Sequence, residues 1–357
     1  MKEHNRVYGL DIYRAIAILL VVFVHGSFLL NNTVLEGFPY IKMIDGVELF
    51  FVLSGFLIGG ILLKEINRGE VFSVKQLGTF WKRRWFRTLP NYYLILLLNY
   101  IVVRNGFIIE DINQFSWKFI FFLQNFSSPF YGFFWESWSL AVEEWFYLLF
   151  PIVLIILLKL LSPKKAFLIT TILMLLGPLL YRISIVNPAI DNFWYDVTFR
   201  KVVLARLDSI AYGLLAAWVF YYYKNVWQKV RIPAFVLGVV GIIFLVYYEA
   251  PVTGIYKQVV YFSLVPVAAV AMLPFAESIK TGRGIFAKAI THISIISYSM
   301  YLINLALVAE VLRDNFAPTG NADGILKYAI YWIVVVGAST LLYKYFEKPI
   351  MNLRNKK

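Results

Sequence analysis

An arginine and a histidine interrupt the first long apolar segment of the chain. It reads Leu10-Asp-Ile-Tyr-Arg-Ala-Ile-Ala-Ile-Leu-Leu-Val-Val-Phe-Val-His-Gly, so Arg14 and His25 are eleven residues apart. Eleven residues make about three helical turns, which places both side chains on one face with a rise of roughly 16 Å. A snorkelling position for Arg14 and an interhelical hydrogen bond for His25 are the alternatives. Because ionisable groups inside apolar spans usually mark functional sites, and two on one face strengthen each other, we favour a functional role for the pair.

A basic run with two aligned arginines lies further along the chain. It reads Trp81-Lys-Arg-Arg-Trp-Phe-Arg-Thr-Leu-Pro90, and Arg84 and Arg87 are three residues apart. On a helix both guanidiniums share a face, and their planar forks match phosphate oxygens bidentately. A purely topological anchor that contacts lipid headgroups is the alternative, for which Lys82 and Arg83 are sufficient.

Two adjacent carboxylates, Glu143 and Glu144, begin a later apolar segment. Neighbours on a helix point about 100° apart, so at most one of them looks directly into an internal site. Glu143 shares a polar ridge with Ser139 and Tyr147, whereas Glu144 shares its ridge with leucines. Glu143 is therefore the better candidate to face inward.

Other polar or small residues in apolar segments have structural interpretations. Gly55 and Gly59 form a small-xxx-small pair suited to close helix packing. Arg206 and Asp208, two residues apart, are expected to neutralise each other.

The composition is that of a membrane protein. The 357 residues are 60% hydrophobic and only 15% charged, below the roughly 25% of a soluble domain. With no cysteine in the chain, disulfides, thiol nucleophiles and cysteine-based metal sites are excluded. The three histidines are scattered, so no metal site is expected.

The apolar windows predict an all-α, polytopic membrane protein with about ten transmembrane helices. The first segment is too long, and holds an arginine, for a cleaved signal peptide. Segment 107–138 contains an aromatic run, from Trp117, that is too short to span and reads as a re-entrant or interfacial piece. The predicted spans are 10–30, 46–63, 90–103, 139–158, 166–184, 203–223, 232–248, 257–275, 289–312 and 325–345.

The charge of the connecting segments alternates along the chain. Cytoplasmic loops are the basic ones, so the basic segments and both termini are predicted to be cytoplasmic. The same rule accounts for the net charge of +13, and nucleic-acid binding is not expected. The basic segments are 64–87, 159–165, 224–231, 280–288 and 344–357.

Taken in order, these residues resemble the motifs of the membrane-bound acyltransferase-3 family. Arg14 and His25 fit its Arg-x10-His signature, and the resemblance covers almost the whole chain. Ala141 and Trp145 depart from the family, where serine and glutamine are common. The further matches are Phe50-Phe-Val-Leu-Ser-Gly-Phe-Leu, Arg84-Trp-Phe-Arg87 with Pro90, Trp138-Ser-Leu-Ala-Val-Glu-Glu-Trp-Phe-Tyr, Ser297-Tyr-Ser-Met-Tyr-Leu and Glu347-Lys-Pro.

The resemblance implies an integral-membrane O-acyltransferase of surface glycans. The implied donor is a cytoplasmic acyl-CoA, usually acetyl-CoA, and the implied acceptor is a sugar hydroxyl of a lipid-linked or cell-surface polysaccharide. No permanently bound cofactor is implied. The location would be the bacterial inner or plasma membrane, with residues 1–357 forming a single transmembrane acyltransferase-like domain. Some relatives carry an extracytoplasmic hydrolase-like domain that is not seen here, so transfer would be completed by the membrane domain or by a separate glycan-assembly partner.

The resemblance also suggests residue roles. Arg84 and Arg87 would bind CoA phosphates, with Arg14 further in. His25 would act as general base on the acceptor hydroxyl or be acylated as a relay, and the sequence leaves both open. Glu143 is a hypothetical orienting carboxylate for the imidazole.

A transporter or flippase for a glycan or a small anion is the alternative function. It also has about ten spans and membrane-embedded ionisable residues. It does not account for the ordered motif set.

Overall fold

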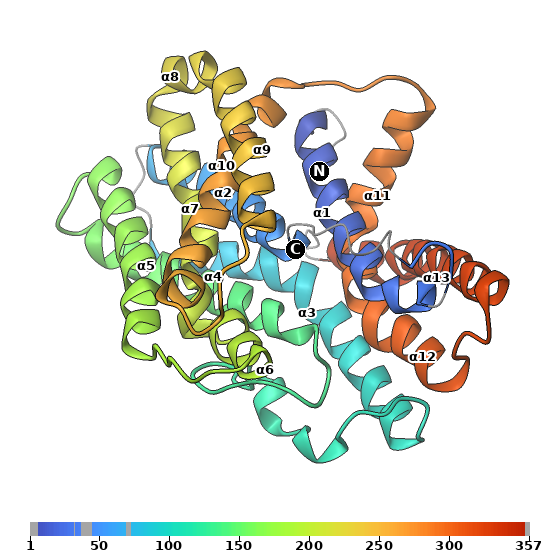
Figure 1. Cartoon of the computed structure of the whole chain (residues 1–357). Helices are drawn as coiled ribbons and strands as arrows, with labels where there is room; N and C mark the ends of the chain where they lie inside the picture. Colours follow the sequence, from blue (N-terminus) through green and yellow to red (C-terminus); the bar gives the residue numbers. More distant parts are fainter. Residues whose placement is uncertain (1–5, 32, 37–44, 69–72, 354–357) are drawn as a thin grey trace.

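The described part of the chain is built from helices and the segments that connect them (Figure 1). The structure, a computed structural model, describes residues 6–31, 33–36, 45–68 and 73–353. His4 and the terminal cations Arg354, Lys356 and Lys357 lie outside these ranges, and the cytoplasmic position of both termini stays a prediction. The main helices are α1 (Tyr8–Gly26), α2 (Gly46–Ile66), α3 (Val74–Arg104), α4 (Ser137–Leu157), α5 (Pro163–Ser184), α7 (Val203–Tyr222), α9 (Arg231–Tyr247), α10 (Tyr261–Ser278), α11 (Gly284–Ile303) and α13 (Asn321–Leu342).

Short helical pieces extend or join the main helices. Four of the pieces in the described chain are π-helical, a geometry that often marks functional sites. The pieces are η2 (Ser27–Leu30), η3 (Ile112–Gln114), η4 (Trp117–Phe119), α6 (Asn192–Tyr195), η5 (Asp196–Arg200), α8 (Lys224–Lys229), η6 (Tyr256–Val260), η7 (Asn304–Glu310), α12 (Val311–Asn315), η8 (Tyr343–Glu347) and α14 (Lys348–Leu353).

Eight helical segments in the described residues are long and apolar enough to cross a membrane. The chain is therefore a polytopic membrane protein, as predicted. The other two expected spans, 90–103 and 232–248, are helical but fall short of that standard. Helix α9 has only 17 residues, and the first half of α3 is strongly basic.

Local sequence signals set the starts of the helices around the site. The Asp45 carboxylate accepts the backbone N–H of Val47, 2.9 Å away, and so caps α2. Ser73 and Gln76 form a capping box that begins α3. Pro163 occupies the first turn of α5, where its missing N–H costs nothing.

Helices α2 and α7 pack closely through glycines. A Cβ atom on Gly55 would lie 2.0 Å from the carbonyl oxygen of Ile210, and one on Gly213 would lie 2.1 Å from that of Val52. Gly59 is similarly close to the side chain of Ala217. The prediction that Gly55 and Gly59 serve helix packing is confirmed.

Two buried ion pairs join the helices around α7. Arg182 on α5 donates to Asp208 at 2.7 Å, with side-chain exposures of 0% and 1%. Arg206 pairs with Glu48 on α2. The expected pairing of Arg206 with Asp208 is wrong, because residues two apart on a helix point to different sides and each finds its partner on another helix.

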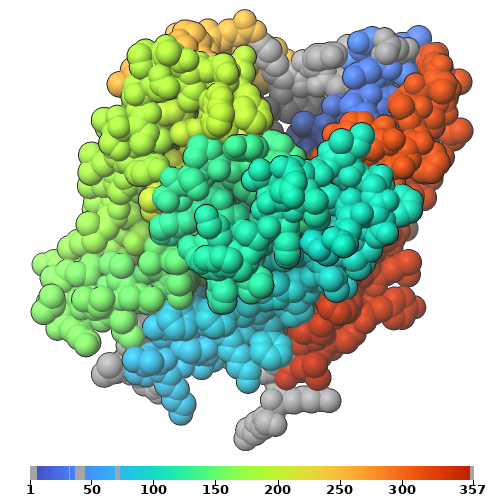
Figure 2. All heavy atoms as spheres, turned by 90° about the horizontal axis from the view of Figure 1, so that it is seen from below, coloured from blue at the N-terminus to red at the C-terminus, as the bar shows by residue number. Residues whose placement is uncertain are grey.

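The connecting segment 105–136, called here the aromatic loop, folds back against α3 and α4. The hydroxyls of Tyr92 and Tyr93 donate to the carbonyl oxygens of Phe119 and Ile120. Tyr92 lies twelve residues before Arg104, the last residue of α3, which corresponds to about 18 Å along the helix. Side-chain donors on α3 thus satisfy carbonyl groups of this loop. The loop covers the middle of the face shown in Figure 2, in teal and green.

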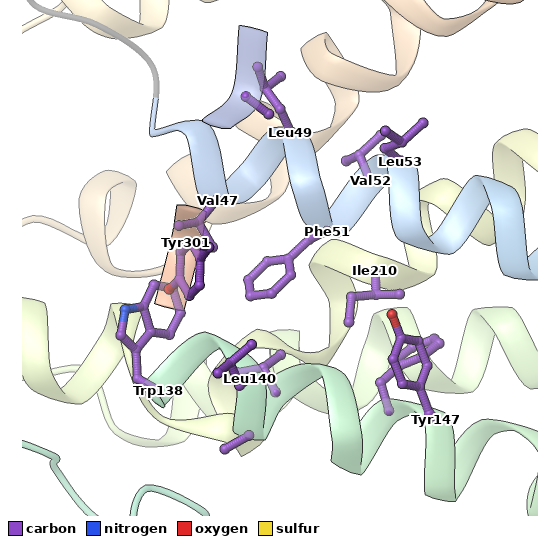
Figure 3. Close-up of a cluster of buried hydrophobic side chains, with 14 of the residues drawn as sticks. Val47, Leu49, Phe51, Val52, Leu53, Trp138, Leu140, Tyr147, Ile210 and Tyr301 are labelled. Carbon is purple, nitrogen blue, oxygen red and sulfur yellow. The ribbon is translucent and has the colours of Figure 1, made fainter. Parts of the chain in front are cut away.

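The core next to the site lies between α2 and α4, where Phe51 and Ile210 fill the space (Figure 3). Phe51 on α2 packs edge-on against Trp138 on α4, with ring centroids 5.9 Å apart. Tyr301 on α11 lies beside Trp138 and Val47 in the same view. Its hydroxyl contacts that of Ser139 at 2.6 Å. Three helices from distant parts of the sequence are thereby fixed relative to one another.

Candidate active site

The structure brings Arg14, Arg84 and Arg87 together. Arg14 lies on α1 and the other two lie on α3, and Arg14 is close enough to both for electrostatic repulsion. None of the three forms an ion pair with a described carboxylate, and the buried Nε of Arg84 has no hydrogen-bond partner. Clustered guanidiniums without paired carboxylates have the chemistry to bind an anion with several oxygens.

Tyr147 and Glu143 on α4 surround Arg84. The guanidinium lies over the Tyr147 ring, 4.2 Å from its centroid. The Tyr147 hydroxyl contacts that of Ser54 at 2.5 Å, and the charge of Glu143 acts on Arg84. The charge of Glu143 also acts on Arg87. Glu143 therefore belongs to the arginine cluster.

Glu144 is more deeply buried than its neighbour. Its carboxylate accepts the hydroxyl of Thr88 on α3 at 2.7 Å. Glu143 is half-buried. The ridge argument thus places Glu143 on the more accessible side, while Glu144 ties α4 to α3.

Motif residues near the end of the chain complete the surroundings of Arg87. Ser299 on α11 and Asn91 on α3 donate to the same Glu347 oxygen, at 2.8 and 3.0 Å. The charge of Glu347 acts on Arg87. The motifs that begin at Ser297 and Glu347 therefore meet the Arg84–Arg87 motif in space.

His25 lies at the other end of α1, next to the first residue of η7. Its Nδ1 is 2.6 Å from Oδ1 of Asn304. Among the described residues, His25 and Glu143 share no hydrogen bond or ion pair; the carboxylate whose charge acts on His25 is that of Asp45. The structure thus gives the imidazole a neutral amide partner where the sequence suggested a carboxylate.

An ionic network before α2 and in η5 faces His25. Arg200 bonds to Asp45 through Nε at 2.9 Å and to Asp196 at 2.9 Å, and Lys201 bonds to Asp196 at 2.6 Å. Although burial opposes both charged forms, the pairing raises the pKa of Arg200 and lowers that of Asp45. Arg200 and Lys201 also lie over the rings of Trp138 and Trp135.

Sequence reasoning missed Asn304 and the Asp45–Arg200 network. A signal for Asn304 was present, because it is the one polar residue between Tyr301 and Glu310 in an apolar span. Asp45 and Arg200 stand at segment ends, where charged residues are ordinary. Only the fold brings them to His25.

Comparison with known proteins identifies the protein family of the chain. A family model described as "Acyltransferase domain", of the acyltransferase 3 type, matches residues 7–344. A protein of Staphylococcus aureus strain COL named "Putative O-acetyltransferase" is 25% identical over 379 residues, and one of strain MSSA476 with the same name is 26% identical; each match covers 98% of this chain and 58% of the relative.

The O-acetyltransferase OatA of S. aureus strain NCTC 8325 / PS 47 is 25% identical over 362 residues, which cover 96% of this chain and 57% of OatA. The chain thus spans a little over half the length of the curated relatives it matches. No solved structure matches it.

Proposed function

The chain belongs to the acyltransferase 3 family, and from that premise we propose that it is an O-acetyltransferase that moves an acetyl group from acetyl-CoA to a sugar hydroxyl. The names of the relatives support O-acetyl transfer. The acceptor class proposed is a lipid-linked or cell-surface polysaccharide. The observation that carries the proposal is the cluster of Arg84 and Arg87 on α3 with Arg14, which lies on the face of α1 that leads to His25.

The arginine cluster is proposed to hold the CoA phosphates. Guanidiniums grip phosphate oxygens bidentately, and these three have no paired carboxylate in the described residues. Arg14 and His25 are on one face of α1, about 16 Å apart. A cytoplasmic acyl-CoA bound at the arginines would extend its thioester arm along α1 towards His25.

His25 is proposed to act on the acceptor hydroxyl. The imidazole takes the hydroxyl proton as the hydroxyl oxygen bonds to the thioester carbonyl carbon. The carbon–sulfur bond then breaks, the CoA thiolate leaves, and the proton passes from the imidazolium to that sulfur. The products are the sugar ester and CoA with a free thiol.

The test is acetyl transfer by the purified chain in lipid vesicles, with labelled acetyl-CoA and candidate glycans on either side. Label in the glycan, absent with His25→Ala, supports the proposal. Glycan crossing the vesicle membrane without acetylation would overturn it in favour of a transporter. A vesicle without protein is the control for leakage.

A further inference from the structure

The orientation of the Asn304 side chain is set by two backbone carbonyl groups. Its Nδ2 donates to the carbonyl oxygens of Met300 at 2.8 Å and Tyr301 at 2.7 Å. Both partners accept and cannot donate. Exchanging the amide oxygen and nitrogen would place an oxygen against two oxygens, so the network settles which atom faces His25.

The local backbone explains why an asparagine takes this position. Asn304 is the first residue of the π-helix η7, directly after α11. At such a transition the i→i−4 hydrogen-bond pattern is interrupted, and a side-chain amide can bond to the carbonyl groups one turn back. The side chain is fully buried. It is therefore held in one orientation.

From this orientation we infer that Asn304 is a positioning residue that fixes the tautomer of His25. Because Oδ1 of Asn304 only accepts, the Nδ1 atom of His25 must carry a hydrogen and donate it across the 2.6 Å contact. In the neutral ring the lone pair then resides on Nε2. Nε2 forms no hydrogen bond with another described residue, so this nitrogen is available to a substrate.

The inference rests on the proposed function and makes one step of it specific. The acceptor hydroxyl breaks its O–H bond and gives the proton to Nε2, while Nδ1 keeps its own hydrogen. The resulting imidazolium carries hydrogens on both nitrogens and returns the Nε2 hydrogen to the departing sulfur of CoA. The opposite tautomer would present an N–H to the hydroxyl and could not accept its proton.

The Asp45–Arg200–Lys201 group has a different role. These charges act on His25 through space, and the effect of the Asp45 carboxylate opposes that of the cations Arg200 and Lys201. In the part of the chain that the structure describes, these side chains form no hydrogen bond with the ring, so none of them fixes which nitrogen carries the hydrogen. The amide of Asn304 is the described group that can.

Nitrogen-15 NMR of the full chain in lipid nanodiscs tests the tautomer without relying on activity. The chain has three histidines, so ¹⁵N-histidine labelling gives few signals, and loss of one pair in His25→Ala assigns those of His25. At about pH 8, which lies above the ordinary pKa of a histidine side chain, the ring is neutral. We expect a protonated Nδ1 and an unprotonated Nε2; a protonated Nε2 would overturn the inference.

The variant Asn304→Ala completes the test. We expect the Nε2-protonated form to gain population and the turnover number to fall at least about tenfold, with acetyl-CoA affinity unchanged. His292 is the internal control, because its Nε2 lies 3.0 Å from the Thr340 hydroxyl and its signals should not move. An unchanged His25 tautomer in this variant would contradict the inference. If wild type shows the expected tautomer but His25→Ala still transfers acetyl groups, the proposed function fails instead.

Discussion

Arg84 stacks on the ring of Tyr147, with its guanidinium carbon 4.2 Å from the ring centroid. A planar guanidinium can lie flat on an aromatic face and still use its N–H groups at the edge to bind an anion. The stacking partner comes from α4 and the arginine from α3. The aromatic ring thus supports Arg84 at the proposed anion site without offering a competing negative charge.

Replacing Arg84 and Arg87 by lysine should weaken binding of acetyl-CoA while it keeps the positive charge. Lysine cannot grip phosphate bidentately, and a hydrogen bond between charged groups contributes about 1.5–3 kcal/mol. We expect the apparent KM for acetyl-CoA to rise at least about tenfold, with a smaller change in kcat. Calorimetry with acetyl-CoA measures the affinity directly.

The matched control is Arg83→Lys, because Arg83 is exposed on the same helix. Its affinity should equal that of wild type. If the double-lysine protein binds acetyl-CoA as wild type does, the run on α3 serves only topology and the donor site lies elsewhere.

His25→Ala should abolish acetyl transfer and leave thermal stability close to wild type. General-base help is typically worth about 10²–10⁴-fold, and the side chain is only half-buried at the end of α1. Initial rates and a melting curve in the same detergent check both points. His292→Ala, an exposed histidine on α11, should keep full activity. Wild-type turnover without His25 would refute the catalytic assignment.

Glu143→Gln should cost more activity than Glu144→Gln. The charge of Glu143 acts on both Arg84 and Arg87, and the change to glutamine removes that charge from the arginine cluster. At position 144 a glutamine oxygen can still accept the Thr88 hydroxyl. We expect a loss of about tenfold in kcat/KM for the first change and less for the second. The reverse order would show that Glu144 faces the substrate.

Sequence patterns predicted those features of the site that depend on a single helix or a single run of residues. The spacing of Arg14 and His25 and of Arg84 and Arg87 placed each pair on a shared face, because helical periodicity alone decides it. The packing role of Gly55 followed from the same kind of pattern.

Features that depend on tertiary packing could not be obtained in that way. Arg206 was expected to pair with Asp208, but a buried charge bonds to whichever opposite charge the packing brings near, and for Arg206 that is Glu48 on α2. The partner of His25 was likewise sought on α4 and lies on η7. Spacing along the chain carries no information on which helices are neighbours.

Removing one member of the buried Arg182–Asp208 pair should be far more harmful than removing both. Both side chains are buried, and Arg182→Met leaves the Asp208 carboxylate without its cation. Breaking a buried pair on one side typically costs about 3–5 kcal/mol. The double variant Arg182→Met with Asp208→Leu should recover most of that loss in thermal unfolding. A double variant no more stable than the single one would mean that the pair does more than neutralise charge.

Glu136 should make the folded protein less stable as the pH rises. Burial and then the nearby charges of Glu310 and Glu110 raise the pKa of Glu136 well above its usual value. A carboxyl group with a raised pKa in the folded state contributes stability that is fully present below its unfolded pKa and is lost as the pH rises through its folded pKa. The melting temperature should therefore fall as the pH rises above about 4–5, the usual range for a glutamate. In Glu136→Gln, whose amide oxygen can still accept the Ala306 N–H, that fall should be smaller.

Asp111→Asn is the control from the same loop. Hydrogen bonds from Asn113 and Gln114 lower the pKa of Asp111, so this carboxylate stays ionised across the same pH range. An equal fall in wild type and Glu136→Gln would show that other groups in the fold carry the pH dependence.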